Sequence, residues 1–193
     1  MESLLTGMLS KMGDSGIEKI AQSAGVDAGM AKKILSQAGP LLTSRMADNA
    51  KSKEGLASID SALQNHDGSI FDHMDDVANP DIDTKGSNIL GHILGSNTGG
   101  VVDALSKGNG ADSGSTKKIL EMAAPLILGQ LGSQKKSGGL DAAGIFDMLQ
   151  EEKKGMGSSG DNVLLNLGKK FLDKDNDGSI VDDVIDIAKG FLK

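Results

Sequence analysis

The residues best spaced for chemistry in this 193-residue chain are three alternating aspartates near its C-terminal end, Asp173, Asp175 and Asp177. A glycine, a serine and an isoleucine follow them, and apolar residues at helical spacing lie on both sides. Helix, Asp-x-Asp-x-Asp-Gly-x-Ile, helix is the arrangement of an EF-hand-like calcium loop, in which alternate carboxylates converge on one hard cation. We therefore expect Ca²⁺ as a cofactor here.

The expected metal ligands are oxygen atoms from five residues: Asp173, Asp175, Asp177, Ser179 (through its backbone carbonyl) and Asp183. The twelfth position of the loop, normally a bidentate glutamate, is Val184. We prefer a shortened loop closed by Asp183; Asp182 is the alternative, or else a capping-box partner of Ser179. The missing glutamate predicts weak binding, with a dissociation constant of about 10⁻⁴ to 10⁻³ M. An acidic turn that only caps the last helix is the competing interpretation.

Part of this loop occurs earlier in the chain, where Asp67-Gly-Ser-Ile-x-Asp72 matches residues 177–182. Its first two ligand positions are Leu63 and Asn65, so we expect a turn without calcium, followed by a helix with a capping box formed by Ser69 and Asp72.

The three histidines, His66, His73 and His92, show no common face. A transition-metal site around His73 is less favoured than a solvated acidic helix. The sequence has no nucleophile elbow, no phosphate-binding glycine loop, no HExxH motif and no cysteine. We therefore predict that the protein is not an enzyme.

The elements that position these residues are organised by a duplication. Residues 25–42, GVDAGMAKKILSQAGPLL, are matched 85 positions later by residues 110–127, GADSGSTKKILEMAAPLI. The spacing of apolar residues is helical throughout. We predict an all-α fold with two pseudosymmetric helical repeats, residues 1–97 and 98–156, and a C-terminal EF-hand-like helix-loop-helix, residues 157–193.

Residues 16–35 have the apolar pattern of a helix-turn-helix, with a first helix ending at Gly25 and Asp27 capping a second. DNA readout would need Arg, Asn or Gln in the first turn of the second helix. That turn contains Ala28, Gly29, Met30 and Ala31, and only Lys32 and Lys33 follow it. Two helices meeting at a glycine turn are therefore the favoured interpretation.

Several boundaries follow from breaks in the apolar pattern. We expect Pro40 and its counterpart Pro125 to kink or restart their helices. Residues 48–54 and 133–139 are expected to be polar breaks between helices, and residues 153–160 a flexible link to the last unit. Residues 2–12 are expected to form a helix packed on the core of the protein.

Composition excludes several classes of function. The net charge of −7 argues against binding to nucleic acid or to anionic membranes. With four phenylalanines and no Trp or Tyr, the core must be aliphatic, with nine methionines filling gaps. There is no membrane-spanning run and no signal-peptide pattern, so we expect a cytoplasmic protein.

Four motifs carry a resemblance over most of the chain: the duplicated frame, His-Asp-Gly-Ser-Ile at 66–70, Gly-His-Ile-Leu-Gly at 91–95, and the terminal Phe-Leu-Asp-Lys-Asp-Asn-Asp-Gly-Ser-Ile. In these the chain resembles the YidB-like family of uncharacterised bacterial proteins. The resemblance implies an all-helical bacterial protein and carries no activity with it.

Taken together, these patterns predict a non-enzymatic calcium-binding structural or protein-interaction protein, whose ion stabilises the C-terminal helix pair. A protein partner or self-association is expected, and neither nucleic acid nor a membrane. The alternatives are a helix-turn-helix nucleic-acid-binding protein and a metal-free self-assembling scaffold.

Overall fold

The computed structural model describes residues 3–158, which fall in one unit of the chain and are entirely helical in their regular structure. The all-α prediction is therefore confirmed for this part of the protein. In chain order the elements are α1 (Leu4–Ala24), α2 (Ala28–Asn49), α3 (Lys53–Gln64), the 3₁₀ helix η1 (Ser69–Ala78), α4 (Pro80–Leu94), the 3₁₀ helix η2 (Gly95–Asn97), α5 (Thr98–Asn109), α6 (Ser113–Gly138) and α7 (Ala142–Ser158).

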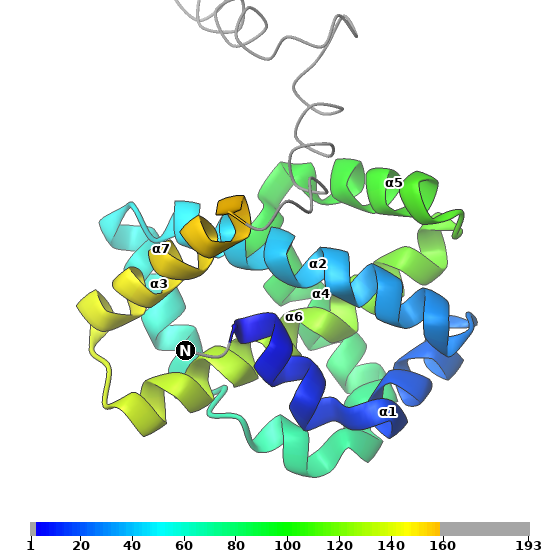
Figure 1. Ribbon diagram of the computed structural model, residues 1–193, viewed down its shortest axis with the longest axis horizontal. Helices are drawn as coiled ribbons and strands as arrows, with labels where there is room; N and C mark the ends of the chain where they lie inside the picture. The colour runs from blue at the N-terminus through cyan, green and yellow to red at the C-terminus, as the bar shows by residue number, and fades with distance from the viewer. Residues whose placement is uncertain (1–2, 159–193) are drawn as a thin grey trace, which may run out of the picture. The chain divides into compact units, whose positions relative to one another are not determined.

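Helix α6 runs through the middle of this unit, as Figure 1 shows. It packs against α1, α2, α3, α4, α5 and η1. Every residue from 119 to 132 is buried, which covers almost four turns on all sides. A helix that is buried around its whole circumference must be surrounded by other helices, so α6 is the element on which most of the described helices pack, whereas α7 packs on α2 and α3.

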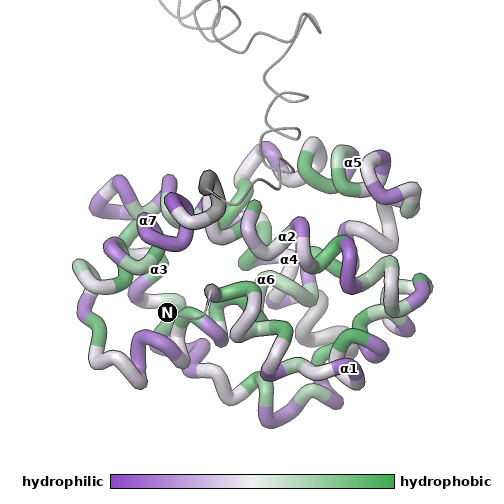
Figure 2. The backbone as a smooth tube through the Cα atoms, in the orientation of Figure 1, coloured by the Kyte–Doolittle hydropathy of each residue, from purple (hydrophilic) through white to green (hydrophobic). Residues whose placement is uncertain are grey.

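The core is aliphatic, as the composition predicts. Figure 2 shows hydrophobic and hydrophilic stretches alternating along the outer helices. The largest fully buried side chains are those of Leu4, Met8, Ile20, Ile34, Leu35, Leu42, Met46, Leu90, Leu105, Ile119, Leu120 and Met122. Three of these are methionines, whose flexible side chains fill irregular gaps between helices.

Glycine allows the closest of these helix contacts. A Cβ atom on Gly86 of α4 would overlap the backbone carbonyl of Glu121 of α6, because the two backbones touch directly at this point. The α4–α6 pair has the most extensive contact in the described unit. Because the backbones touch, no side chain fits between the two helices at this point. This direct contact fixes the position of α4 on α6.

The duplicated segments have the same local structure. Helix α1 ends at Gly25 with φ +71°, and the carboxylate of Asp27 accepts a hydrogen bond from the Met30 amide at 2.9 Å. Helix α5 ends at Gly110 with φ +69°, and Asp112 caps α6 with the same 2.9 Å hydrogen bond. The predicted glycine turn and aspartate cap are therefore confirmed.

The duplicated prolines do not restart their helices. Pro40 lies inside continuous α2 and Pro125 inside continuous α6. A proline removes one backbone hydrogen bond from a helix interior. Residues on both sides of each proline are buried against other helices, and this packing keeps the helix continuous.

The expected break at residues 133–139 is also absent, because α6 continues to Gly138 and ends at Gly139 with φ +60°. Its last turn carries Lys135 and Lys136, which suit the negative end of the helix dipole. Lys135 Nζ also donates to the Asp60 carboxylate of α3 at 2.5 Å. These polar residues extend the helix beyond its buried part.

Two other local predictions are wrong. Residues 153–158 are not a link, because they form the last turns of α7. Ser69 does not form a capping box with Asp72, since η1 begins at Ser69 without a side-chain cap and Gly68 precedes it with φ +99°.

The predicted polar break at residues 48–54 is confirmed. Helix α2 ends at Asn49 and α3 begins at Lys53, with Ser52 as the N-cap of α3.

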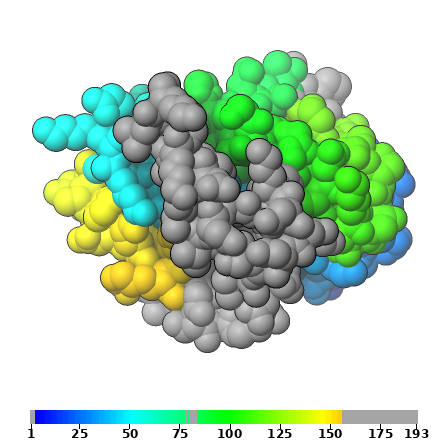
Figure 3. All heavy atoms as spheres, turned by 90° about the horizontal axis from the view of Figure 1, so that it is seen from above, coloured from blue at the N-terminus to red at the C-terminus, as the bar shows by residue number. Residues whose placement is uncertain are grey.

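Helices α3 and α7 lie side by side at one end of the unit, in cyan and yellow to orange in Figure 3. No helix in the described part of the chain combines the length and the apolar character needed to cross a lipid bilayer.

Candidate functional site

The five predicted calcium ligands, Asp173, Asp175, Asp177, Ser179 and Asp183, lie outside the described residues, as does the alternative Asp182. The calcium site therefore stays a prediction from the sequence. The candidate sites that the structure does describe are the partial copy of the loop at residues 67–72, the helix-turn-helix segment and one surface groove.

The partial copy of the loop is a turn held by hydrogen bonds and by a lysine. Asp67 accepts a hydrogen bond from the Ser69 amide at 3.1 Å, and Lys136 of α6 donates to its other carboxylate oxygen at 3.0 Å. The hydrogen bond from Lys136 lowers the pKa of Asp67 to about 2, with a smaller effect from Ser69. The Lys136 ammonium group thus supplies the positive charge that a metal ion would supply in an EF-hand loop.

The histidines do not converge. His66 shares a 2.8 Å hydrogen bond between its Nδ1 and the Ala62 carbonyl, and His73 and His92 are exposed on η1 and α4. Among the side chains that the structure describes, which leave out those of residues 78, 80–83 and 156–158, no three His, Asp or Glu gather in a way that could hold a metal ion.

The first helix-turn-helix segment is formed by α1 and the start of α2. Lys32 and Lys33 are exposed near the start of α2, while Ala31 between the turn and these lysines is buried. The Asp27 cap places a carboxylate at the helix N-terminus, where a phosphate would otherwise be attracted. The first turns of α2 therefore present Asp27, Lys32 and Lys33, and no Arg, Asn or Gln suited to reading base edges.

The second helix of the second helix-turn-helix segment is α6, the central helix of the described unit. Ser115 Oγ donates a 2.6 Å hydrogen bond to the Ala24 carbonyl at the end of α1, and Thr116 is fully buried. The start of α6 is thus joined to the end of α1, and the next turns of α6 are buried in the core.

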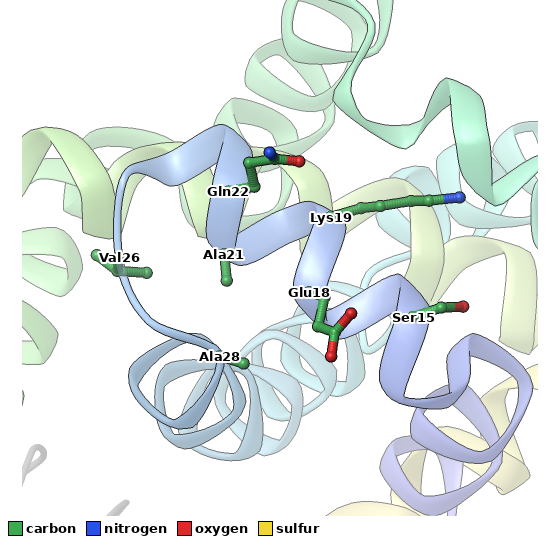
Figure 4. Close-up of a pocket in the computed structure, with 7 residues that line it drawn as sticks. All are labelled: Ser15, Glu18, Lys19, Ala21, Gln22, Val26 and Ala28. Carbon is green, nitrogen blue, oxygen red and sulfur yellow. The ribbon is translucent and has the colours of Figure 1, made fainter.

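A groove of about 590 Å³ lies between the second half of α1 and the start of α2. Figure 4 shows Glu18, Lys19 and Gln22 of α1 along one side, with Val26 and Ala28 at the turn. Lys19 forms an ion pair with Asp75 of η1. The groove contains one acid and one paired base without a nucleophile–base pair, so it offers a surface for contact but no catalytic arrangement.

One carboxylate connects two helices that are distant in the chain. Glu152 of α7 accepts a hydrogen bond from the Leu4 amide at the start of α1, at 3.1 Å. Burial raises the pKa of Glu152 above its ordinary value, and the hydrogen bond from Leu4 opposes this only in part. The carboxylate therefore joins the first and last helices of the described unit.

Several buried or half-buried polar residues could not be identified by motif. Gln37 of α2 and Asn109 of α5 exchange amide hydrogen bonds at 3.2 and 2.8 Å, which joins two helices whose paired residues are 72 positions apart. Glu121 is 7% exposed and pairs with Lys117 one turn earlier on α6. The only sequence signal for these was their place within otherwise apolar helices.

Comparison with known families matches residues 6–134 to the family described as bacterial protein of unknown function (DUF937). The matched region runs from the first turn of α1 into the last third of α6. Neither the curated proteins nor the solved structures provided a match. Because the matched region covers most of the chain and nearly all of the central helix, the chain belongs to this family of bacterial proteins.

Proposed function

We propose that the protein is a non-enzymatic calcium-binding structural or protein-interaction protein, whose ion stabilises its C-terminal helix pair. The observation that carries this proposal is the alternation of Asp173, Asp175 and Asp177 before a glycine. Three carboxylates within five residues repel one another unless a cation lies between them. Oxygen ligands at this spacing suit Ca²⁺.

The helical unit supports this proposal through the way it uses its own carboxylates. Asp48, Asp60 and Asp67 each accept hydrogen bonds from lysines on distant segments of the chain. In residues 173–183 the acids outnumber the single lysine, Lys174. A divalent cation is the natural counter-charge for that excess.

Calorimetric titration of the whole chain with Ca²⁺ tests the proposal. Wild type should bind with a dissociation constant of about 10⁻⁴ to 10⁻³ M. Asp175→Ala should abolish the binding, because it removes a central ligand. Asp72→Ala is the matched control from the partial copy of the loop and should leave the binding unchanged. Absence of binding to wild type at millimolar Ca²⁺ would refute the proposal.

A helix-turn-helix function is the second candidate, and the exposure of Lys32 and Lys33 at the start of α2 favours it. Fluorescence anisotropy of a labelled DNA duplex at low and high salt tests this. Binding that falls with salt and with Lys32→Gln/Lys33→Gln, but not with Lys154→Gln on α7, would support it.

A metal-free scaffold that assembles with itself would be separated from calcium binding by light scattering with and without a chelator. Assembly that is insensitive to the chelator, in a protein that gives no calcium titration, would favour the scaffold.

Two finer assignments are part of the proposal. We propose the two-repeat division at residues 1–97 and 98–156, supported by the equal glycine turns at Gly25 and Gly110. We also propose that the chain is YidB-like, on the motifs at residues 66–70 and 91–95 and in the terminal aspartate segment.

A further inference from the structure

The segment between α3 and α4 lies on the unit without contributing to its core. Leu63 at the end of α3 is 3% exposed, and Val77 near the end of η1 is fully buried. None of the 13 residues between them is buried. We call residues 64–76 the strap. Its two ends are fixed in the core, while the chain between them remains at the surface.

The strap rests on glycines of α6. A Cβ atom on Gly132 would overlap the carbonyl oxygen of His66, and one on Gly129 would lie 2.8 Å from a methyl group of Ile70. On the strap side, Gly68 lies against Ser133. The apolar side chains of Ile70, Phe71 and Met74 lie on α6 and α1 only half-buried, so each stabilises the contact less than a fully buried side chain would.

Lysines of the helical unit hold the strap at several points. Lys136 pairs with Asp67 at 3.0 Å, and Lys19 of α1 pairs with Asp75. Lys11 lies 5.3 Å above the ring of Phe71. These charges are largely exposed to solvent, so they are weak individually and screened by salt.

The internal hydrogen bonding of the strap is also weak. Its regular part is 3₁₀ rather than α-helical, and His73 interrupts it with φ −126° and ψ +45°. The Phe71 amide donates to the Gly68 carbonyl at 3.1 Å across one such turn. Helices of this kind have poorer hydrogen-bond geometry, and segments with few buried apolar contacts open at low free energy.

We propose that the strap is a built-in lid that opens as a unit between Leu63 and Val77 while the helices stay folded. The contacts of Lys11, Lys19 and Lys136 with the strap hold it closed and weaken as the salt concentration rises. We call these contacts the latch. Opening uncovers the glycine surface of α6 around Gly129 and Gly132, and the Gly16 position of α1 on which Met74 rests in the closed state.

Native-state hydrogen exchange of the whole chain, at constant pH, tests the proposal. Strap amides such as Phe71 should exchange at least about 10-fold faster than those of Leu120 and Met122 in α6. Raising NaCl from about 0.05 to 1 M should accelerate strap exchange by about two- to tenfold and leave α6 nearly unchanged. Strap amides that exchange only with global unfolding, at every salt concentration, would overturn the proposal.

Variants of the latch give the second measurement. Lys136→Gln and Lys19→Gln should each accelerate strap exchange at low salt and reduce its salt dependence. Lys154→Gln is the matched control, because Lys154 pairs with Glu151 within α7. If the latch variants behave like the control, the lysines do not hold the strap and the proposal fails.

Gly132→Ala separates the strap from the core directly. The added methyl group would displace the His66 carbonyl, whereas alanine itself favours the α6 helix. Strap protection should be lost while the circular dichroism and the cooperative unfolding of the unit are retained. Gly108→Ala in α5, where a Cβ meets nothing within 4 Å, is the control. A Gly132→Ala protein that unfolds as a whole would show that the strap belongs to the core and would overturn the proposal.

Discussion

Asp48 near the end of α2 and Lys153 on α7 form a two-pronged ion pair, with Nζ of Lys153 lying 2.6 and 2.7 Å from the two carboxylate oxygens of Asp48. The residues are 105 positions apart in the chain. Their side chains are 37% and 34% exposed, so the pair is partly shielded from water. The pair joins α7, the last described helix, to the end of α2.

Loss of this pair should destabilise the unit modestly. We expect Asp48→Asn and Lys153→Met each to lower the free energy of unfolding, with a coupling of about 0.5–1 kcal/mol in a double-mutant cycle, because partly exposed pairs are of this order. Urea unfolding at low salt provides the measurement. Lys51→Met, which breaks only a contact made within one turn of Asp48, is the control and should show a smaller coupling.

The Asp48 carboxylate should also make the free energy of unfolding of the unit sensitive to acid. Burial acts to raise the pKa of Asp48, but the hydrogen bonds from Lys153 and Lys51 outweigh it and hold the pKa below its ordinary value of 3.8. A carboxyl group whose pKa is lower in the folded protein stabilises the fold at pH values above its unfolded-state pKa. This contribution is lost as the pH falls through the folded-state pKa. Wild type should therefore lose more stability than Asp48→Asn between pH 5 and pH 3.

Glu152 should respond to pH in the opposite direction. Burial raises its pKa above 4.5, so the charged form is less favourable in the folded protein than in the unfolded chain. At pH 7 this penalty is fully present, and it disappears as the pH falls through the raised pKa towards the unfolded-state value. We expect Glu152→Gln, which still accepts the hydrogen bond from Leu4, to be more stable than wild type at pH 7. The gain should be absent near pH 4, and a gain that is equal at both pH values would contradict this explanation.

Gly86 should be intolerant of any side chain. Gly86→Ala places a methyl group against the Glu121 backbone, so we expect a loss of about 1–3 kcal/mol in the free energy of unfolding, as is typical of overpacking. Gly91→Ala in the same helix meets nothing within 4 Å and should raise stability by up to about 1 kcal/mol through helix propensity. Thermal unfolding of the two variants distinguishes close packing from propensity. Equal shifts would mean that the α4–α6 contact is looser than described.

The duplicated caps provide a test of the repeat. Asp27→Ala and Asp112→Ala each remove a side-chain acceptor from a helix N-terminus, and both should lower the unfolding temperature by similar amounts. Asp72→Ala, at an exposed position, should leave it unchanged. The hydrogen bonds from the side chain and amide of Ser115 lower the pKa of Asp112, so its contribution should be present above about pH 4 and lost below. A large effect at only one of the two caps would show that the copies have diverged in their energetics.

Local features of this fold could be predicted from the sequence because they depend on residue types a few positions apart. Gly25 and Asp27 define a turn and a cap through their own backbone and side chain, and the same holds for Gly110 and Asp112. The all-α class follows equally directly from helical periodicity. The end of α6 was missed because the apolar run stops before the helix does.

Long-range features could not be predicted from the sequence. No sequence pattern predicts that Asp48 and Lys153, 105 residues apart, form an ion pair. The same holds for the hydrogen bonds between Gln37 and Asn109, which are 72 residues apart. The near-continuous apolar composition of residues 119–132 was a usable sign that α6 is central, since a helix with one exposed side would alternate with polar residues. The strap could not be foreseen, because its attachment depends on glycines that sequence patterns identify only as helix breakers.

The position of α6 along the chain has a consequence for biosynthesis. The helix against which α1 to α5 all pack begins at Ser113, so a ribosome has made residues 1–112 before this helix appears. Until then α1, α3, α4 and α5 can pack only on α2 and on one another, and the apolar faces that α6 later covers stay accessible to chaperones and to neighbouring nascent chains. We therefore expect a polypeptide truncated before residue 113 to expose these faces.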